Sequence, residues 1–378
     1  MEEKERKKER KKERKKERKK ERDSGFELLR IIAMLFIIAH HAVMHGVWIP
    51  EGIGNSFNLV YKNFYFGWTA QIGNYLFIIL SGYFLSQSTF SWRKVFRFWF
   101  QIFSISTAIG LIFFLTRTPV IGYTNWDYDA LGYDAAAKPM DLKDLLFSFI
   151  PNIWGSNWFA CTYLVFYLFS PFLKILLDNL DQKKHLAIII LMLSGTIIQM
   201  IPYEGFFHPS DLYIFIMCYF AASYIRLYNP KILQNTLFNV TVAIFILLVN
   251  FIPSGIYAGI PKVGKLFAYF FNAFWGRYNF PTVVCSFMIF CCFRKIHIPY
   301  NKFINTIAGT TFGVYLIHEN SVLKHYVWHK IFKMDSYVTT PDFIWYLPVA
   351  IIAVFAVCSI IEYLRQILIE RPIMKKLG

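Results

Sequence analysis

The chain has 378 residues, of which 56% are hydrophobic and 19% are aromatic, and it carries a formal net charge of +16. This composition is too apolar for a soluble protein of this size, and apolar runs of about 20 residues, the length of a transmembrane helix, recur along it. The sequence therefore predicts an all-α, polytopic protein whose solvent is the lipid bilayer. A basic excess in such a protein marks the cytoplasmic face of the membrane, so we do not expect nucleic acid as a partner.

A charged repeat opens the chain. Residues 3–22 read EKER and then KKER four times, and Glu and basic residues at i,i+4 spacing favour an exposed helix. We interpret residues 1–24 as a low-complexity cytoplasmic tail and residues 25–378 as the membrane domain. The tail could anchor to anionic lipid, or it could be a repeat expansion or the result of a start codon chosen too far upstream. Its length and the lack of a small-residue cleavage site argue against a secretory signal peptide.

Ten apolar segments are expected to span the membrane. They are residues 26–45, 64–85, 95–115, 158–177, 185–202, 211–227, 236–252, 279–293, 303–319 and 344–364. Basic residues are dense in the short connections between alternate spans, which predicts that both termini are cytoplasmic. The long polar stretch 117–157, rich in Asp and aromatic residues, would then lie outside. Residues 266–275 are also apolar and could form a re-entrant segment.

The first span carries ionisable residues that a lipid-facing helix would not tolerate. Arg30 and His41 are eleven residues apart, so they share one helix face and lie roughly 16 Å apart along its axis. Such groups are costly inside a membrane, and each needs a partner or a task. Arg30 could pair with Glu27, one turn earlier. His40 points about 100° away from His41, so the two cannot face the same site.

His41 is a candidate for proton transfer. A neutral imidazole is the usual general base for deprotonating a hydroxyl group. His45 shares its face at i+4, a spacing that can bind a metal ion, but no acidic or Cys ligand lies nearby in sequence, so we expect no metal. The six cysteines all lie in or beside apolar spans, and we interpret them as small packing residues.

The second and third spans add further basic and polar candidates for a functional site. Lys94 and Arg97, one helical turn apart, and Arg93 beside them introduce the third span. They could bind the phosphates of a nucleotide-like donor, or they could be ordinary positive-inside flanks. Asn74 and Ser81 share one face of the second span, where they could line a site or allow close helix packing.

A polar stripe ends the ninth span. Thr311, Tyr315, His318 and Glu319 follow i, i+4, i+7 and i+8 spacing on an otherwise apolar helix. This stripe could pair with His41 across the bundle. Alternatively, His318 and Glu319 could simply lie at the membrane interface.

Taken in order, these motifs resemble the acyltransferase-3 family of integral-membrane sugar and glycan O-acyltransferases. The similar segments are LRIIAMLFIIAHH in the first span, FIILSGYFL in the second, WFACTYLVFYLFSPFL in the fourth, TFGVYLIHEN in the ninth and IERP near the C-terminus. The similarity extends over about residues 26–375. No soluble hydrolase-like domain follows the tenth span, so the chain resembles the stand-alone membrane form.

The resemblance implies roles for individual residues. His41 is similar to the family's catalytic histidine and Arg30 to its partner in handling the acyl donor. The family's Arg-x-x-Arg pair before the third span corresponds to Lys94 and Arg97, with Arg93 just ahead. A Lys holds phosphate as a point charge rather than bidentately.

The resemblance also implies a reaction. We expect transfer of an acyl group, acetyl foremost, from acyl-CoA to a hydroxyl of a cell-envelope or exported carbohydrate, at the plasma membrane. Acyl-CoA would be a co-substrate, and no bound cofactor is expected. Transfer could be direct or could pass through an acyl-histidine. The stretch 117–157 is either an acceptor site or a solvated loop.

A transporter or flippase for a lipid-linked glycan is the alternative function. Many spans with buried charges would suit it equally. The two halves of the sequence show no internal repeat, which counts against that alternative.

Overall fold

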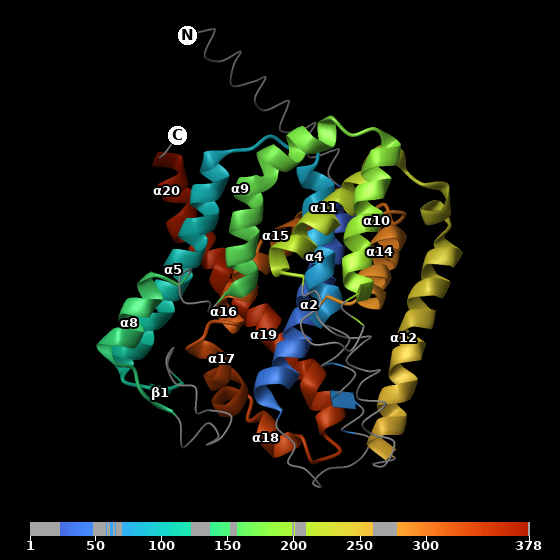
Figure 1. Cartoon of the computed structure of the whole chain (residues 1–378). Coiled ribbons are helices and arrows are strands. Elements are labelled where there is room, and N and C mark those ends of the chain that lie inside the picture. Colours follow the sequence, from blue (N-terminus) through green and yellow to red (C-terminus); the bar gives the residue numbers. More distant parts are fainter. Residues whose placement is uncertain are drawn as a thin grey trace.

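A computed structural model of the chain describes residues 23–47, 58, 61–62, 65, 70–121, 137–151, 157–198, 200, 209–259 and 278–376. These residues are almost all helical, and the strands among them are the short antiparallel pair β1 (Pro119–Val120) and β2 (Lys138–Pro139) (Figure 1). A mainly helical fold is therefore confirmed for this part of the chain. The charged repeat, the apolar segment 266–275 and residues 122–136 of the long polar stretch lie outside the described residues.

Each of the ten predicted spans overlaps helix in the structure. Nine of them fall on α2 (Ser24–Gly46), α4 (Ala70–Leu85), α5 (Trp92–Thr116), α9 (Trp158–Asp178), α10 (Gln182–Ile198), α11 (Asp211–Tyr228), α12 (Thr236–Gly259), α14 (Phe280–Phe293) and α19 (Phe343–Arg365). The ninth range is divided between α15 (Lys302–Ala308) and α16 (Thr311–His318).

Four helices of the described chain are long and apolar enough to cross a membrane, namely α2, α5, α9 and the continuous helical stretch Phe343–Lys376. Shorter apolar helices cover Gln71–Leu85, Thr236–Val249 and Phe280–Phe293. The number of ten spans and the cytoplasmic position of both termini stay predictions.

Shorter elements connect and extend these helices. They are α8 (Leu142–Phe149), η2 (Lys231–Gln234), α17 (Leu323–Tyr326), η4 (Val327–Ile331), α18 (Met334–Tyr337), η5 (Gln366–Glu370) and α20 (Arg371–Lys376). Helices α17 to α18 lie at the opposite end of the molecule from α20 (Figure 1).

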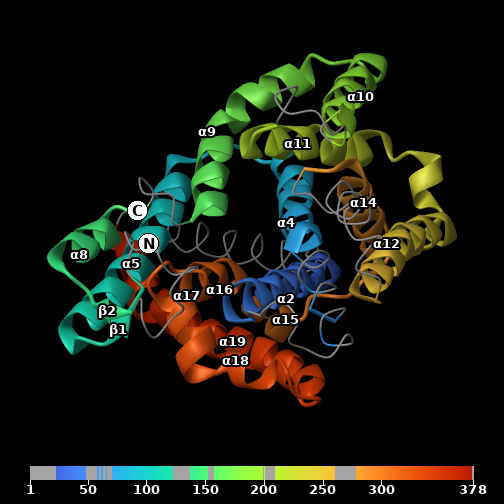
Figure 2. The ribbon, with the colours of Figure 1, turned by 60° about the horizontal axis from the view of Figure 1, so that its bottom comes forward.

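Helices α2 and α4 lie side by side in the middle of the bundle (Figure 2). Helix α4 also packs on α11 and α14, while α2 packs on α15, α16 and α19. Glycines permit the closest approaches, because a Cβ on Gly73 would lie 2.7 Å from the Ala33 carbonyl oxygen and one on Gly82 would lie 2.8 Å from Tyr219 Cα.

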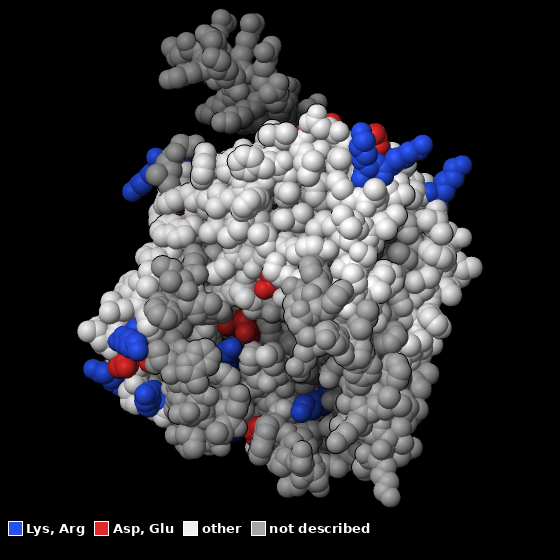
Figure 3. Space-filling view, in the orientation of Figure 1, with Lys and Arg blue, Asp and Glu red and all other residues white. Residues whose placement is uncertain are grey.

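The turns predicted to be cytoplasmic meet at one end of the bundle. The Ser24 amide donates to the Ile298 carbonyl at 2.8 Å, and Arg226 Nη1 donates to the Tyr83 carbonyl at 2.8 Å. Lys and Arg side chains stand out around the start of α10 at this end, and others stand out around α8 toward the opposite end (Figure 3). The predicted orientation therefore stays a prediction.

The predicted ninth span is two helices rather than the single one expected. Thr310 Oγ1 donates to the Ile307 carbonyl and Thr311 Oγ1 to the Ala308 carbonyl, at 2.7 and 2.8 Å. The Ile307 carbonyl also accepts from the Thr310 amide at 2.9 Å, so the threonine hydroxyl groups add to the backbone hydrogen bonds at the break between α15 and α16. The carbonyl of Gly309 is left to accept a hydrogen bond from Gln366 Nε2 at 2.9 Å, from the end of α19.

Candidate active site

Helix α2 carries Arg30 at one end of the candidate site and His41 at the other. Its first turn is capped by Asp23, whose side chain accepts from the Gly25 amide at 2.7 Å. One turn later, Arg30 Nη1 donates to Glu27 Oε2 at 2.7 Å, so the local ion pair that the spacing allowed is present. The Arg30 side chain is still 27% exposed. The pair therefore fixes Arg30 without removing it from solvent.

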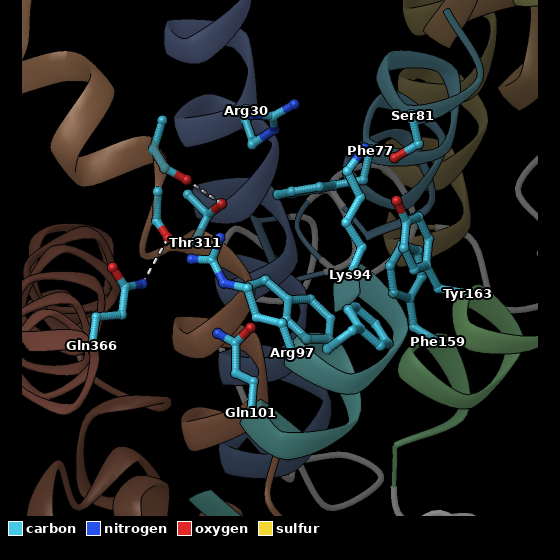
Figure 4. A pocket seen from close by; sticks show the side chains of 14 residues that line it. Arg30, Phe77, Ser81, Lys94, Arg97, Gln101, Phe159, Tyr163, Thr311 and Gln366 are labelled. Atoms are coloured by element: carbon cyan, nitrogen blue, oxygen red, sulfur yellow. Dashed lines mark hydrogen bonds between the residues drawn. The ribbon is translucent and has the colours of Figure 1, made fainter. Parts of the chain in front are cut away.

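The exposed part of Arg30 faces a cavity of about 320 Å³ between α2, α4, α5, α9 and α16 (Figure 4). Lys94 and Arg97 enter it from α5, and Ser81 enters it from α4. The structure thus brings together three of the four residues predicted to bind the donor, although they are separated by up to 67 positions in the chain.

The rest of the cavity wall is largely aromatic. Its aromatic lining residues are Phe77, Phe98, Phe159, Tyr163 and Phe312. The hydroxyl groups of Tyr163 and Ser81 also lie at the wall of this cavity (Figure 4). The cavity is therefore cationic on one side and apolar with a few hydroxyl groups on the other.

Arg93 lies outside this cavity. Its Nη2 donates to the Met374 carbonyl on α20 at 2.6 Å, and it lines a neighbouring cavity instead. Of the two adjacent residues that could match the first position of the family's basic pair, Lys94 is therefore the one that faces Arg30.

An ion network behind the cavity was not predicted. Arg97 Nε donates to Glu370 Oε1 at 2.6 Å, and the other oxygen of Glu370 accepts from Arg365 Nη2. Arg365 also holds Glu362 bidentately, with distances of 2.7 and 2.8 Å. Glu362 and Glu370 are at most 2% exposed. Buried charges of this kind persist only when they are paired, as here.

Two glutamines tie this network to the cavity wall. Gln101 Nε2 and Gln366 Nε2 both donate to Glu362 Oε1, at 3.0 and 2.7 Å, and both glutamines line the cavity. The sequence did hold a signal, since Glu362 and Arg365 stand at i,i+3 at the end of an apolar run.

Apart from the cavity and the ion network behind it, a second group of polar side chains surrounds His41. Its Nδ1 is 2.9 Å from His318 Nε2 and 3.1 Å from Glu319 Oε2, and all three residues are at most 9% exposed. His45 Nε2 lies 3.2 Å from both oxygens of the same carboxylate. The contact expected between His41 and the polar stripe is thus present, although the two segments are 277 positions apart.

The hydrogen bonds assign the tautomers of this cluster. His318 Nδ1 lies 2.6 Å from the Val314 carbonyl oxygen, which can only accept, so Nδ1 carries the proton. His318 Nε2 then accepts, and the proton on the other side of that contact belongs to His41 Nδ1. The lone pair of neutral His41 is consequently on Nε2, and none of the hydrogen bonds found among the described residues uses this atom.

A metal ion is a geometric alternative at this cluster. One ligand atom each from His41, His318 and Glu319 lies within 4.8 Å of the others, and Glu319 supplies the acidic ligand that the local sequence lacked. Two nitrogen ligands of one tetrahedral zinc ion would stand about 3.3 Å apart. The observed 2.9 Å between His41 and His318 suits a shared proton better.

Tyr315 lies between the aromatic wall of the cavity and His41. Its ring centroid lies 6.5 Å from that of His41 and 5.8 Å from that of Phe159 in the cavity wall. His40 is buried, with its ring centroid 5.6 Å from that of His41, but it is not one of the groups on His41 Nδ1. Asn74 is half-buried on α4 and does not line the cavity.

Comparison with known proteins identifies the family of this chain. A family described as "Acyltransferase domain" matches residues 23–363, a range that includes Arg30, Lys94, Arg97, His41 and Glu319 but ends before Glu370. No curated protein and no solved structure matches the chain. A match over nearly the whole chain shows that this membrane protein belongs to the acyltransferase-3 family.

Proposed function

We propose that the protein transfers an acyl group, acetyl in the simplest case, from acyl-CoA to a hydroxyl group of a cell-envelope or exported carbohydrate. One observation carries the proposal: a basic cavity and a carboxylate-bound histidine occur on the same helix, at Arg30 and at His41. Their separation of roughly 16 Å suits a donor whose charged nucleotide and reactive thioester are joined by a long, flexible arm.

The donor would bind from the end of the bundle that holds Arg30. Lys94 and Arg97 would contact its phosphates by charge-assisted hydrogen bonds. The arm would follow the aromatic wall past Phe159 toward Tyr315, whose ring is next to both Phe159 and His41. The thioester would then lie beside the imidazole.

His41 would act as the general base. Its Nε2 takes the proton of the acceptor hydroxyl, whose oxygen attacks the thioester carbonyl carbon. The tetrahedral intermediate collapses when the carbon–sulfur bond breaks, and the imidazolium returns the proton to the departing thiolate. The products are the carbohydrate ester and the free thiol, with no net change in protons.

Glu319 would stabilise His41 while it carries the extra proton. Its carboxylate lies 3.1 Å from Nδ1, on the opposite side of the ring from the reacting nitrogen. His45 and Lys324 hold that carboxylate, with Lys324 Nζ 3.4 Å from Oε1.

We further propose that both termini are cytoplasmic, that the membrane is the plasma membrane, and that the acceptor approaches from the outer side.

Membership of an acyltransferase family favours acyl transfer over transport of an unmodified glycan. A vesicle assay separates the two functions. Purified protein in lipid vesicles would receive labelled acetyl-CoA and a crude cell-envelope glycan extract. Label on the carbohydrate supports the enzyme, whereas movement of unlabelled, unmodified glycan across the vesicle membrane supports a transporter.

The sharpest variant for this assay is His41→Asn. An Asn amide can still donate toward His318 and Glu319 from about the position of Nδ1, but it has no basic nitrogen in place of Nε2. We expect transfer to fall at least about 100-fold while the protein remains inserted and monodisperse. Lys183→Ala, an exposed basic residue at the start of α10, serves as the control. Wild-type transfer by His41→Asn would refute the catalytic assignment.

A further inference from the structure

A second cavity, of about 750 Å³, adjoins the first near the C-terminal helix. Its charged lining comes from α5 and from the end of the helical stretch that continues α19, and comprises Arg93, Lys94, Arg97, Glu370, Arg371 and Lys375. Lys94 and Arg97 line both cavities. A ligand held by these two side chains could therefore extend into either space.

The charge of this second cavity is strongly positive. Glu370 is its acidic residue, but one carboxylate oxygen accepts from Arg97 Nε and the other from Arg365, which lies behind the wall. The carboxylate is therefore already neutralised by its partners. Concave sites with one sign of charge raise the local concentration of ligands of the opposite sign.

The basic residues of α5 and those of α20 are also fixed relative to each other. Arg93 Nη2 donates to the Met374 carbonyl at 2.6 Å, which joins α5 to α20 across the cavity. Arg97 is oriented through its Nε, and none of the hydrogen bonds found in the described chain uses its terminal Nη groups. A planar guanidinium held in this way offers two donors side by side to a phosphate group.

We propose that the second cavity binds the phosphates at the nucleotide end of the acyl donor, and that Arg371 and Lys375 of the C-terminal helix are donor-binding residues. This inference rests on the proposed function. The first cavity, at about 320 Å³, is at the lower limit for a small-molecule site, so it suits the arm and acyl group alone. Arg30 is already paired with Glu27, which leaves too few free cations there for a diphosphate and a separate 3′-phosphate.

An anionic lipid headgroup shares the phosphate chemistry, but two features favour the nucleotide. Lys94 and Arg97 continue directly into the aromatic cavity, where the arm of the same ligand would follow. The guanidinium of Arg97, aligned by Glu370, is set for bidentate contact rather than for diffuse surface attraction. The test is therefore made in vesicles of neutral phosphatidylcholine and repeated with added phosphatidylglycerol.

The double variant Arg371→Ala/Lys375→Ala carries the test. We expect the KM for acetyl-CoA to rise at least about tenfold, equivalent to one good charged contact, with kcat unchanged. Binding of adenosine 3′,5′-bisphosphate to the purified protein, which needs no turnover, should weaken by a similar factor. Lys376→Ala is the matched control, since Lys376 is the next residue of the same helix and does not line the cavity. Replacing Arg371 by Lys instead of Ala should retain part of the affinity for the bisphosphate.

The outcomes distinguish this inference from the proposed function. Unchanged KM and unchanged bisphosphate affinity in the double variant overturn the inference, even if acetyl transfer is intact. An effect that appears only with phosphatidylglycerol present also overturns it, because the site would then be a lipid site. Bisphosphate binding that needs Arg371 and Lys375, in a protein that transfers no acyl group, would keep the site and refute acyl transfer.

Discussion

Arg97 and Glu370, 273 positions apart, are joined by a hydrogen bond of 2.6 Å between Nε and Oε1. The Arg97 side chain is 58% exposed while that of Glu370 is 3% exposed. A buried carboxylate thus holds the inner edge of a solvent-facing guanidinium. The structure thereby converts a flexible surface arginine into one whose outer edge has a defined direction, at the junction of two cavities.

Glu370→Gln should raise the KM for acetyl-CoA with little change in kcat. The amide oxygen can still accept from Arg97, but the stronger charge-assisted bond is lost, and such bonds contribute about 1.5 kcal/mol or more. The expected rise is therefore about tenfold. Steady-state kinetics with acetyl-CoA as the varied substrate measures it.

A double-mutant cycle provides the control for this prediction. If Glu370 acts by orienting Arg97, Glu370→Gln should add almost nothing to the effect of Arg97→Ala on KM. Arg97→Ala by itself should weaken donor binding more than acceptor binding. Fully additive effects of the two changes would mean that Glu370 acts through Arg365 and the packing of α19 instead.

The outline of the fold followed from the sequence because its signals are local. Apolar runs located the helices, since each spanning helix bonds its own backbone. The helical period placed Arg30 and His41 on one face, and a polar stripe of the same period made His318 and Glu319 possible partners of His41, with a position at the membrane interface as the alternative. Each of these inferences needs only residues within one helix.

The remaining features depend on pairs that no local pattern specifies. The partner of Arg97 lies 273 positions away, so nothing near Arg97 distinguished it from an ordinary basic flank. Arg93 and Lys94 are adjacent, and only the packing of α20 against α5 sends one to Met374 and the other toward Arg30. Two threonine hydroxyl groups donate to carbonyls of the preceding turn at the break before α16, but threonine is common in continuous membrane helices as well, so its presence did not predict the break.

Glu319→Gln should lower kcat by about 100-fold or more while leaving the KM for acetyl-CoA near its wild-type value. The amide keeps the size of the side chain but no longer carries the charge that stabilises the imidazolium. Single-turnover transfer of labelled acetyl to the glycan extract measures the chemical step. Lys324→Ala, which removes a weaker partner of the same carboxylate at 3.4 Å, should have a smaller effect. Equal effects of the two changes would contradict the assigned role.

Gly313→Ala should destabilise the protein and weaken donor binding. A Cβ at this position would lie 2.3 Å from Cγ and Cδ of Glu362, so α16 and α19 would have to separate. Overpacking of this kind costs about 1–3 kcal/mol, and it would disturb the carboxylate that holds Arg365. Thermal unfolding in detergent measures the first effect and the KM for acetyl-CoA the second. At Gly309 the nearest atom would be 3.3 Å away, so Gly309→Ala should be milder; the reverse order would contradict the packing argument.

Phe159→Leu should change which acyl chain is preferred. Phe159 lines the cavity, and its ring is 5.8 Å from that of Tyr315, which stands next to His41. The side chain therefore limits the space where the acyl group would lie, and a smaller residue should admit a longer chain. One methylene in an apolar pocket changes selectivity by about 10-fold or more, so kcat/KM for butyryl-CoA should rise relative to acetyl-CoA.

Phe166→Leu is the matched control for this change. Phe166 is on the same helix, is fully buried and packs on Phe215 as Phe159 does, but it does not line the cavity. Both variants remove the same aromatic volume from α9, so both should lower the unfolding temperature. A shift toward butyryl-CoA in Phe159→Leu alone would locate the acyl group beside Phe159. An equal shift in both variants would mean that general loosening of α9 sets the preference, and the acyl group would then have to be placed elsewhere.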